Sequence, residues 1–221
     1  MIIDHTHPFY KQRWKQAGAN KYNGAYYYSK EIVKNIIPNV KTDRNWVTVN
    51  IAGTGADHAI VFIHNNLHPE NYDWLKRFGD LILVCGIPET AETMKERGFR
   101  AVYLPLSIDT EYVKQFKIPK AEQKGAAYIG RPAKRKIPGV EIPEGIDIIE
   151  GLERSKMLAK MAKYETVYAV GRTAIEAKCL GCKLKPYDPR FPKVSRWKVI
   201  DNVEAAAMLQ KLIDEVDGVT V

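Results

Sequence analysis

The residue types best suited to ligand chemistry gather in one stretch of the chain, residues 164–188. A short β-branched run there is followed by Gly171-Arg172-Thr173, and Glu176 comes one helical turn later. N–H groups at the start of a helix, with a guanidinium beside them, suit a phosphate. A carboxylate one turn further along can accept hydrogen bonds from ribose hydroxyls. This spacing therefore predicts a nucleotide-binding turn.

Arg172 and Glu176 also permit a simpler interpretation. Residues four apart are neighbours on the surface of a helix, so these two side chains can form an ion pair that merely supports the helix. The sequence alone leaves both interpretations open.

Two short strands and one helix must position this turn. The apolar run over 166–170 predicts a buried strand, the segment 174–180 a helix that ends at Gly181, and the segment 182–185 a second strand. Together they form a βαβ unit. Ligands of such units bind beyond the carboxyl end of the strand, which is where Gly171 lies.

The same alternation of strands and helices extends over the whole chain. It predicts an α/β protein with parallel sheets, built as two small Rossmann-like, doubly wound domains. The polar segment 107–124 is typical of a linker, which places the domains at residues 1–114 and 115–221. The binding site is then expected in the cleft between them.

Charge adds a second signal, because the 221 residues carry a formal net charge of +8 at pH 7. Basic residues gather in the acid-free segment 9–30, in the segment 131–136 and in the segment 190–198. Such clusters attract phosphates, whether those of a nucleotide or those of DNA. Each cluster taken singly also fits an ordinary solvated surface.

Composition argues against a membrane protein and against a secreted one. No apolar run approaches the ~20 residues that a membrane-spanning helix needs. The first residues lack the basic and apolar regions of a signal peptide. Cys179 and Cys182 form a lone CxxC pair, which favours packing over a zinc or redox site. We therefore expect a cytoplasmic protein without a membrane span.

Five segments, taken in order, resemble the GT-B glycosyltransferases, in particular the large retaining superfamily that uses nucleotide sugars. Two of them lie in the predicted second domain. Tyr128-Ile129-Gly130-Arg131, with Lys136 five residues after the arginine, is similar to the "G-R-x4-K" segment of that family, and the run from Gly171 to Gly181 is similar to its "G-x4-E-A-x3-G" segment. The other three are Asn23-Gly24-Ala25 before a tyrosine-rich helix, His64 at a strand end, and Leu104-Pro105-Leu106-Ser107-Ile108-Asp109 at the close of the first domain.

The resemblance implies a GT-B fold and the transfer of a sugar from a nucleoside diphosphate, most simply from a UDP-sugar. It implies no metal and no further cofactor, because cationic side chains stabilise the charge on the leaving diphosphate. The donor-binding residues that it implies are Arg131, Lys136, Gly171, Arg172, Thr173 and Glu176. It assigns a catalytic role to His64 and places His5, His7, Gly24 and Asn65 on the acceptor or sugar side. A histidine at a strand end can equally be structural.

Two further features keep the function open. Tyr168 stands where the family often has a glutamate, eight residues before Glu176, which favours a non-catalytic nucleotide or sugar-nucleotide binding protein of the same fold as the alternative. In the segment 9–30, aromatic residues alternate with basic ones, a composition that suits nucleic acid. Together with the segment 131–136, it suggests DNA as a partner and a modified DNA base as one acceptor.

Overall fold

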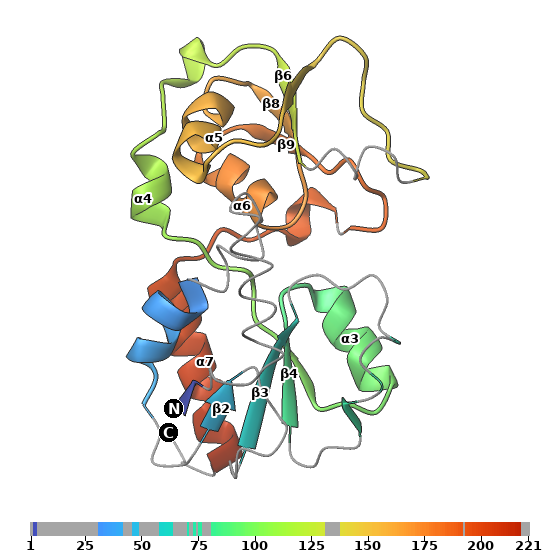
Figure 1. Ribbon diagram of the computed structural model, residues 1–221, viewed down its shortest axis with the longest axis vertical. Coiled ribbons are helices and arrows are strands. Elements are labelled where there is room, and N and C mark those ends of the chain that lie inside the picture. Colours follow the sequence, from blue (N-terminus) through green and yellow to red (C-terminus); the bar gives the residue numbers. More distant parts are fainter. Residues whose placement is uncertain are drawn as a thin grey trace. The chain divides into compact units, whose positions relative to one another are not determined.

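The computed structural model describes residues 2–3, 31–41, 46–48, 58–63, 70, 73, 75–76, 81–130, 138–191 and 193–217. They form two compact units, each with its own parallel sheet (Figure 1). Among the described residues, unit 1 comprises those up to Pro105 and those from Asn202 onward, and unit 2 runs from Leu106 to Asp201. The expectation of an α/β protein with parallel sheets is confirmed.

The sheet of unit 1 has its strands in the order in which they occur in the chain. These strands are β1 (Ile2–Ile3), β2 (Trp46–Thr48), β3 (His58–Ile63), β4 (Leu81–Cys85) and β5 (Ala101–Tyr103), and every neighbouring pair is parallel. A doubly wound sheet requires a reversal of strand order, and the described strands of unit 1 contain none. The prediction of double winding is therefore wrong for these strands. The pattern of apolar residues predicts a buried parallel strand. It does not predict at which edge of the growing sheet that strand is added.

One apolar cluster of unit 1 forms between β4 and α3 (Pro88–Glu96). All five residues of β4 are buried, as expected for a strand covered on both faces. Proline suits the first turn of a helix because it lacks the N–H that would have no partner there, and Pro88 opens α3. Met94 is fully buried against Leu83 and Phe99 in one apolar cluster.

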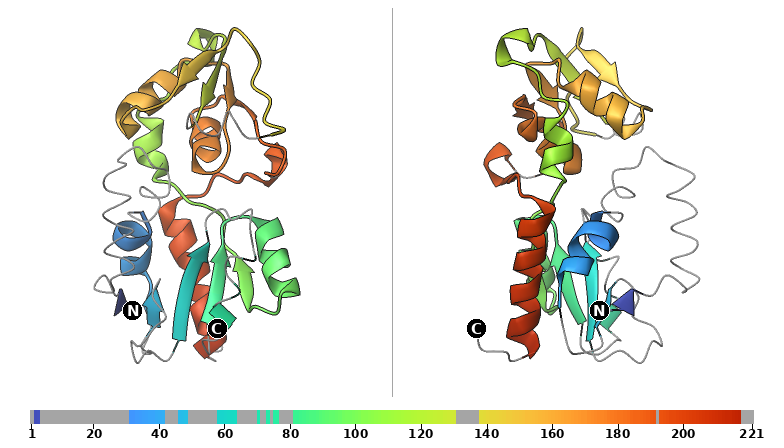
Figure 2. Two further views of the ribbon diagram at one scale, coloured as in Figure 1. Left: turned by 45° about the vertical axis from the view of Figure 1, so that its right-hand side comes forward. Right: turned by 90° about the vertical axis from the view of Figure 1, so that its left-hand side faces the viewer.

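The last helix, α7 (Asn202–Asp217), belongs to unit 1 although the sequence placed it in the second domain. It packs against the short helical segments η1 (Ile32–Ile36) and η2 (Ile37–Asn39), and both views of Figure 2 show it alongside this sheet. The side chain of Gln210 accepts a hydrogen bond from the N–H of Lys41 at 2.6 Å and donates one to its carbonyl at 2.7 Å. These contacts join residues far apart in sequence, so the predicted domain ranges 1–114 and 115–221 do not coincide with the two units.

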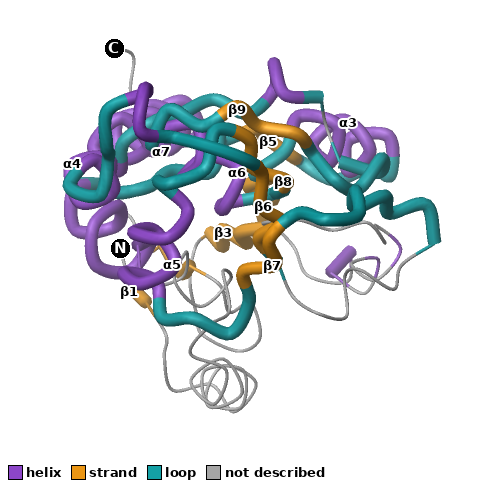
Figure 3. The backbone as a smooth tube through the Cα atoms, turned by 90° about the horizontal axis from the view of Figure 1, so that it is seen from above, coloured by secondary structure: helices purple, strands orange, loops and turns teal. Residues whose placement is uncertain are grey.

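Unit 2 contains a sheet whose strand order does reverse. Its strands are β6 (Ala126–Ile129), β7 (Asp147–Ile149), β8 (Thr166–Tyr168) and β9 (Lys183–Lys185). They lie in the order β7-β6-β8-β9 (Figure 3). All neighbouring pairs are parallel. The helix α5 (Arg154–Met161) connects β7 to β8, and α6 (Arg172–Cys179) connects β8 to β9. After β6 the chain adds β7 on one side of β6, and it then crosses over to add β8 on the other side of β6.

The segment 107–124 was expected to be a linker, but it is an ordered part of unit 2. It contains α4 (Thr110–Lys114) and the short turn η4 (Lys120–Glu122). The carboxylate of Asp109 caps α4 by accepting a hydrogen bond from the N–H of Tyr112 at 2.8 Å. Val113 is fully buried. One buried residue in a short polar helix leaves too little apolar periodicity for the sequence to reveal.

The two segments at the ends of unit 2 are hydrogen-bonded to each other. The N–H of Ile108 donates to the carbonyl of Ile200 at 3.2 Å, and Ile108 pairs with Asp201 in a parallel bridge. The carboxylate of Asp201 also accepts from both the N–H and the hydroxyl of Thr110, at 3.1 and 2.8 Å. The beginning and the end of unit 2 are therefore adjacent. None of the helices in the described ranges is long and apolar enough to cross a membrane.

Gly130, directly after β6, has no room for a side chain. A β-carbon there would lie 2.6 Å from Cζ of Tyr128, which is fully buried and packs on Tyr187 with ring centroids 4.9 Å apart. Because that ring cannot move aside, we expect Gly130→Ala to lower the free energy of unfolding by about 1–3 kcal/mol in urea denaturation.

A double-mutant cycle tests the cause of that loss. Replacing Tyr128 by Leu removes the ring that the β-carbon would meet, so Gly130→Ala should cost less in a Tyr128→Leu background. An equal cost in both backgrounds would show that the phenol ring is not the obstacle.

Candidate functional site

The candidate site lies at the point where the strand order of unit 2 reverses. β7 and β8 lie on opposite sides of β6, so the strand order reverses after β6. Open parallel sheets bind their ligands outside the carboxyl ends of the strands at such a switch point. Gly130 follows β6 there, and Gly171 follows β8 after two intervening residues.

The turn at Gly171 requires glycine. Its backbone has φ 65° and ψ −142°, a conformation that side-chain-bearing residues rarely adopt. Its carbonyl accepts the first hydrogen bond of the helix, from the N–H of Ala174 at 3.0 Å. As a result α6 begins at Arg172, two residues earlier than predicted, and no side chain caps this helix start. Arg172 and Thr173 therefore lie in the first turn of the helix.

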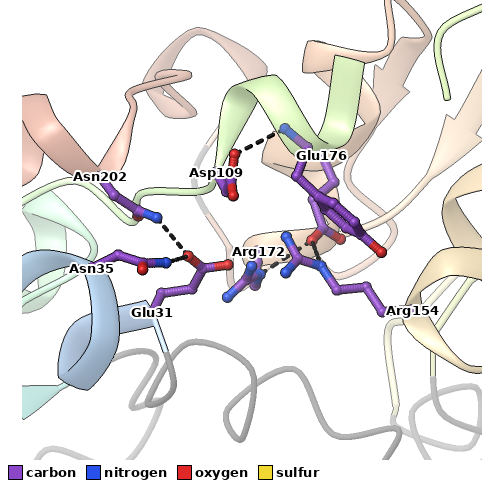
Figure 4. Close-up of polar contacts among 8 residues, drawn as sticks. Glu31, Asn35, Asp109, Arg154, Arg172, Glu176 and Asn202 are labelled. Atoms are coloured by element: carbon purple, nitrogen blue, oxygen red, sulfur yellow. Dashed lines mark hydrogen bonds and ion pairs between the residues drawn. The ribbon is translucent and has the colours of Figure 1, made fainter. Parts of the chain in front are cut away.

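A buried cluster of three charged side chains adjoins this turn (Figure 4). Arg172 donates from Nε to Oε1 of Glu176 at 3.1 Å, and Arg154 donates from Nε to the same oxygen at 3.0 Å. The side chains of Arg172, Glu176 and Arg154 are 6%, 3% and 13% exposed. The ion pair that the four-residue spacing allowed is therefore present, and a second arginine completes it.

The cluster lies next to the start of a helix. Two guanidinium groups share the Glu176 carboxylate close to the first turn of α6. The start of a helix carries a partial positive charge. Backbone N–H groups at that end of a helix suit an anion.

Arg154 is the member of the cluster that the sequence did not single out. It begins α5, 22 residues before Glu176, and its guanidinium lies 5.2 Å from the centre of the Tyr112 ring. The segment 154–163 was predicted as a basic helix, but local spacing cannot relate it to α6. Only the order of strands and helices could have related the two helices. α5 and α6 each follow a strand of one parallel sheet, so both begin at its carboxyl edge.

The structure brings together only some of the residues that the sequence predicted. Gly171, Arg172, Thr173 and Glu176 lie together in the turn and first helix turns after β8. The remaining predicted site residues lie outside the described residues: His5, His7, Gly24, His64, Asn65, Arg131 and Lys136. Within the described ranges, no group of histidine, cysteine and acidic side chains could hold a metal ion.

Tyr168 and the cysteines complete the surroundings of the site. Tyr168 ends β8, and its hydroxyl lies 3.4 Å from Nζ of Lys185 at the end of β9. Cys179 and Cys182 are free thiols, and burial raises the pKa of Cys182 to about 11. The sulfur of Cys182 contacts the carbonyl of Met161 at 3.6 Å, which is a packing role.

Comparison with known proteins adds no relative to this geometry. The chain matches no protein-family model, and neither curated proteins nor solved structures give a match.

Glu176 should be essential for the stability of unit 2. Glu176→Gln preserves the size of the side chain but removes the negative charge between two buried guanidinium groups. We expect it to lower the free energy of unfolding by about 3 kcal/mol, measured by urea denaturation.

The matched control is Glu122→Gln, which removes the same charge from an exposed position in unit 2 and should change stability by less than about 0.5 kcal/mol. Adding Arg172→Met to Glu176→Gln removes one of the two guanidinium groups that shared the carboxylate, and it should recover part of the loss. Equal stability of Glu176→Gln and Glu122→Gln would contradict the proposed role of the carboxylate.

Proposed function

We propose that this protein is a metal-independent glycosyltransferase that binds the nucleoside diphosphate of a sugar donor at the switch point of unit 2. The observation that carries the proposal is the position of the Gly171 turn. It lies at the carboxyl end of β8, beside the cluster of Arg154, Arg172 and Glu176.

Phosphate chemistry supports this choice of ligand. The first turn of α6 presents backbone N–H groups without a side-chain cap, and the guanidinium groups of Arg154 and Arg172 lie in the adjacent cluster. Both features favour a diphosphate over a neutral ligand. Arg131 and Lys136 follow Gly130 in the sequence, and the resemblance assigns them to the same diphosphate.

Only one of the two carboxylate oxygens of Glu176 would contact the ribose. Its Oε1 accepts hydrogen bonds from both arginines, so a ribose hydroxyl of the donor would bond to Oε2. The carboxylate would then orient the two guanidinium groups and hold the ribose at once. Departure of the diphosphate concentrates negative charge next to these cations, which is the charge that such sites stabilise.

The transfer reaction itself rests on the resemblance to GT-B enzymes. By that resemblance, His64 acts at the sugar, with His5, His7, Gly24 and Asn65 on the acceptor side. UDP is the expected nucleotide.

One observation favours a second candidate function, a sugar-nucleotide binding protein without catalysis. The position where the family often has a glutamate holds Tyr168, whose hydroxyl lies 3.4 Å from the ammonium group of Lys185. A carboxylate that could contact the donor sugar is therefore replaced by a phenol and a cation. Nucleotide binding would not require that carboxylate, whereas the transfer reaction would require it.

Nucleotide binding is tested by thermal unfolding of the full chain with UDP, GDP or ADP. A nucleotide at 100 times its dissociation constant adds about 2.7 kcal/mol to stability, so we expect UDP to raise the unfolding temperature by several degrees. Arg131→Ala/Lys136→Ala should reduce that shift, whereas Lys156→Ala/Lys160→Ala, which removes two exposed lysines of α5, should preserve it. Absence of a shift with all three nucleotides would overturn the proposal.

Catalysis is tested by following free UDP after incubation with UDP-sugars, with and without candidate acceptors. Release of UDP that decreases in His64→Ala supports the transferase, provided that this variant retains its thermal shift with UDP. Binding without release or transfer would leave the non-catalytic function in its place.

A further inference from the structure

A second basic feature of unit 2 is separate from the candidate site. The segment 189–200 contains four basic residues and no acidic one. These are Arg190, Lys193, Arg196 and Lys198, and each has an exposed side chain. We call residues 189–198 the basic loop. It follows β9 at the edge of the sheet, whereas the candidate site lies between β6 and β8.

Contacts within the basic loop and with α6 fix its conformation. The rings of Phe191 and Trp197 stack with centroids 6.2 Å apart and an angle of 27° between their planes, and both residues are buried. Between them the chain forms the short helical turn η6 (Val194–Arg196). Nζ of Lys178 in α6 donates a hydrogen bond to the carbonyl of Trp197. An ordered loop loses little conformational entropy when it binds a partner.

One of the four cations anchors the loop. Arg190 forms a two-pronged ion pair with Asp188, through Nε to Oδ1 at 2.9 Å and Nη2 to Oδ2 at 2.7 Å. Asp188 is fully buried, so this pair fixes the base of the loop. Lys193 and Lys198 form no ion pair with another described residue. Both lysine side chains are exposed to solvent.

We propose that the basic loop binds the phosphate backbone of double-stranded nucleic acid. Exposed lysine and arginine side chains bind phosphates without reading sequence, and a net charge of +8 attracts a polyanion over long range. Proteins that prefer single strands stack bases on exposed aromatic rings. The aromatic rings of the basic loop are buried against each other, which favours a duplex.

The same observations disfavour a membrane surface as the partner. Binding to anionic lipid is strengthened when large apolar or aromatic side chains enter the interface. Among the described residues of the segment 189–200, the exposed large hydrophobic residues are Val194 and Val199, each only 37% exposed. The inference does not depend on the nucleotide site, because no residue of the basic loop belongs to that site.

The test is binding of a short fluorescent DNA duplex to the full chain, without nucleotide sugar, over a range of salt concentrations. Lys193→Ala/Lys198→Ala removes two phosphate contacts. It should weaken binding several-fold and make the slope of log K against log salt shallower by about 1.8. The matched control, Lys34→Ala/Lys211→Ala, removes two exposed lysines of unit 1 and should alter the slope by less than half as much.

The outcomes separate this inference from the proposed function. Loss of duplex binding in Lys193→Ala/Lys198→Ala, with the thermal shift by UDP intact, supports the basic loop as a separate site. The inference is overturned if the wild type does not bind the duplex, if both double variants lose binding equally, or if single strands bind more tightly than the duplex. Loop-dependent binding to anionic vesicles but not to DNA would assign the loop to a membrane.

Discussion

One buried carboxylate organises the carboxyl end of the sheet in unit 2. Glu176 accepts hydrogen bonds from Arg172 of its own helix and from Arg154 at the start of another. Neither guanidinium could remain so deeply buried without a counter-charge, because an unpaired buried ion is costly. The carboxylate therefore fixes the first turns of α5 and α6 relative to each other. Any ligand at the switch point would meet an arrangement of charge that is already in place.

Local signals in the sequence were sufficient for the βαβ unit around Gly171. A β-branched run predicted β8, Gly171 predicted the turn, and Gly181 predicted the end of α6, since each depends on residues close together in the chain. The ion pair between Arg172 and Glu176 was one of two interpretations that the helical spacing allowed. The second arginine of the cluster, Arg154, could not be predicted from local spacing, because its contact with Glu176 depends on the order of strands in the sheet.

The arrangement of unit 1 was less accessible for the same reason. The pattern of apolar residues predicted α7 as a helix, and the structure confirms it. It did not reveal that α7 packs against η1 and η2, since that contact joins opposite ends of the chain. Nor could it order the strands, because each parallel strand can join either edge of a growing sheet. Seven of the predicted site residues lie outside the described ranges, so their prediction remains a prediction.

The hydrogen-bonded pairing of Ile108 with the segment at Ile200 and Asp201 has a consequence for how the protein matures. In the described part of the chain, unit 2 is one continuous segment with adjacent ends, inserted into unit 1. During synthesis, residues 106–201 leave the ribosome before α7 does. Domains fold as units once their residues are available. The inserted unit can therefore be complete while the unit that hosts it, although begun first, still lacks its last helix.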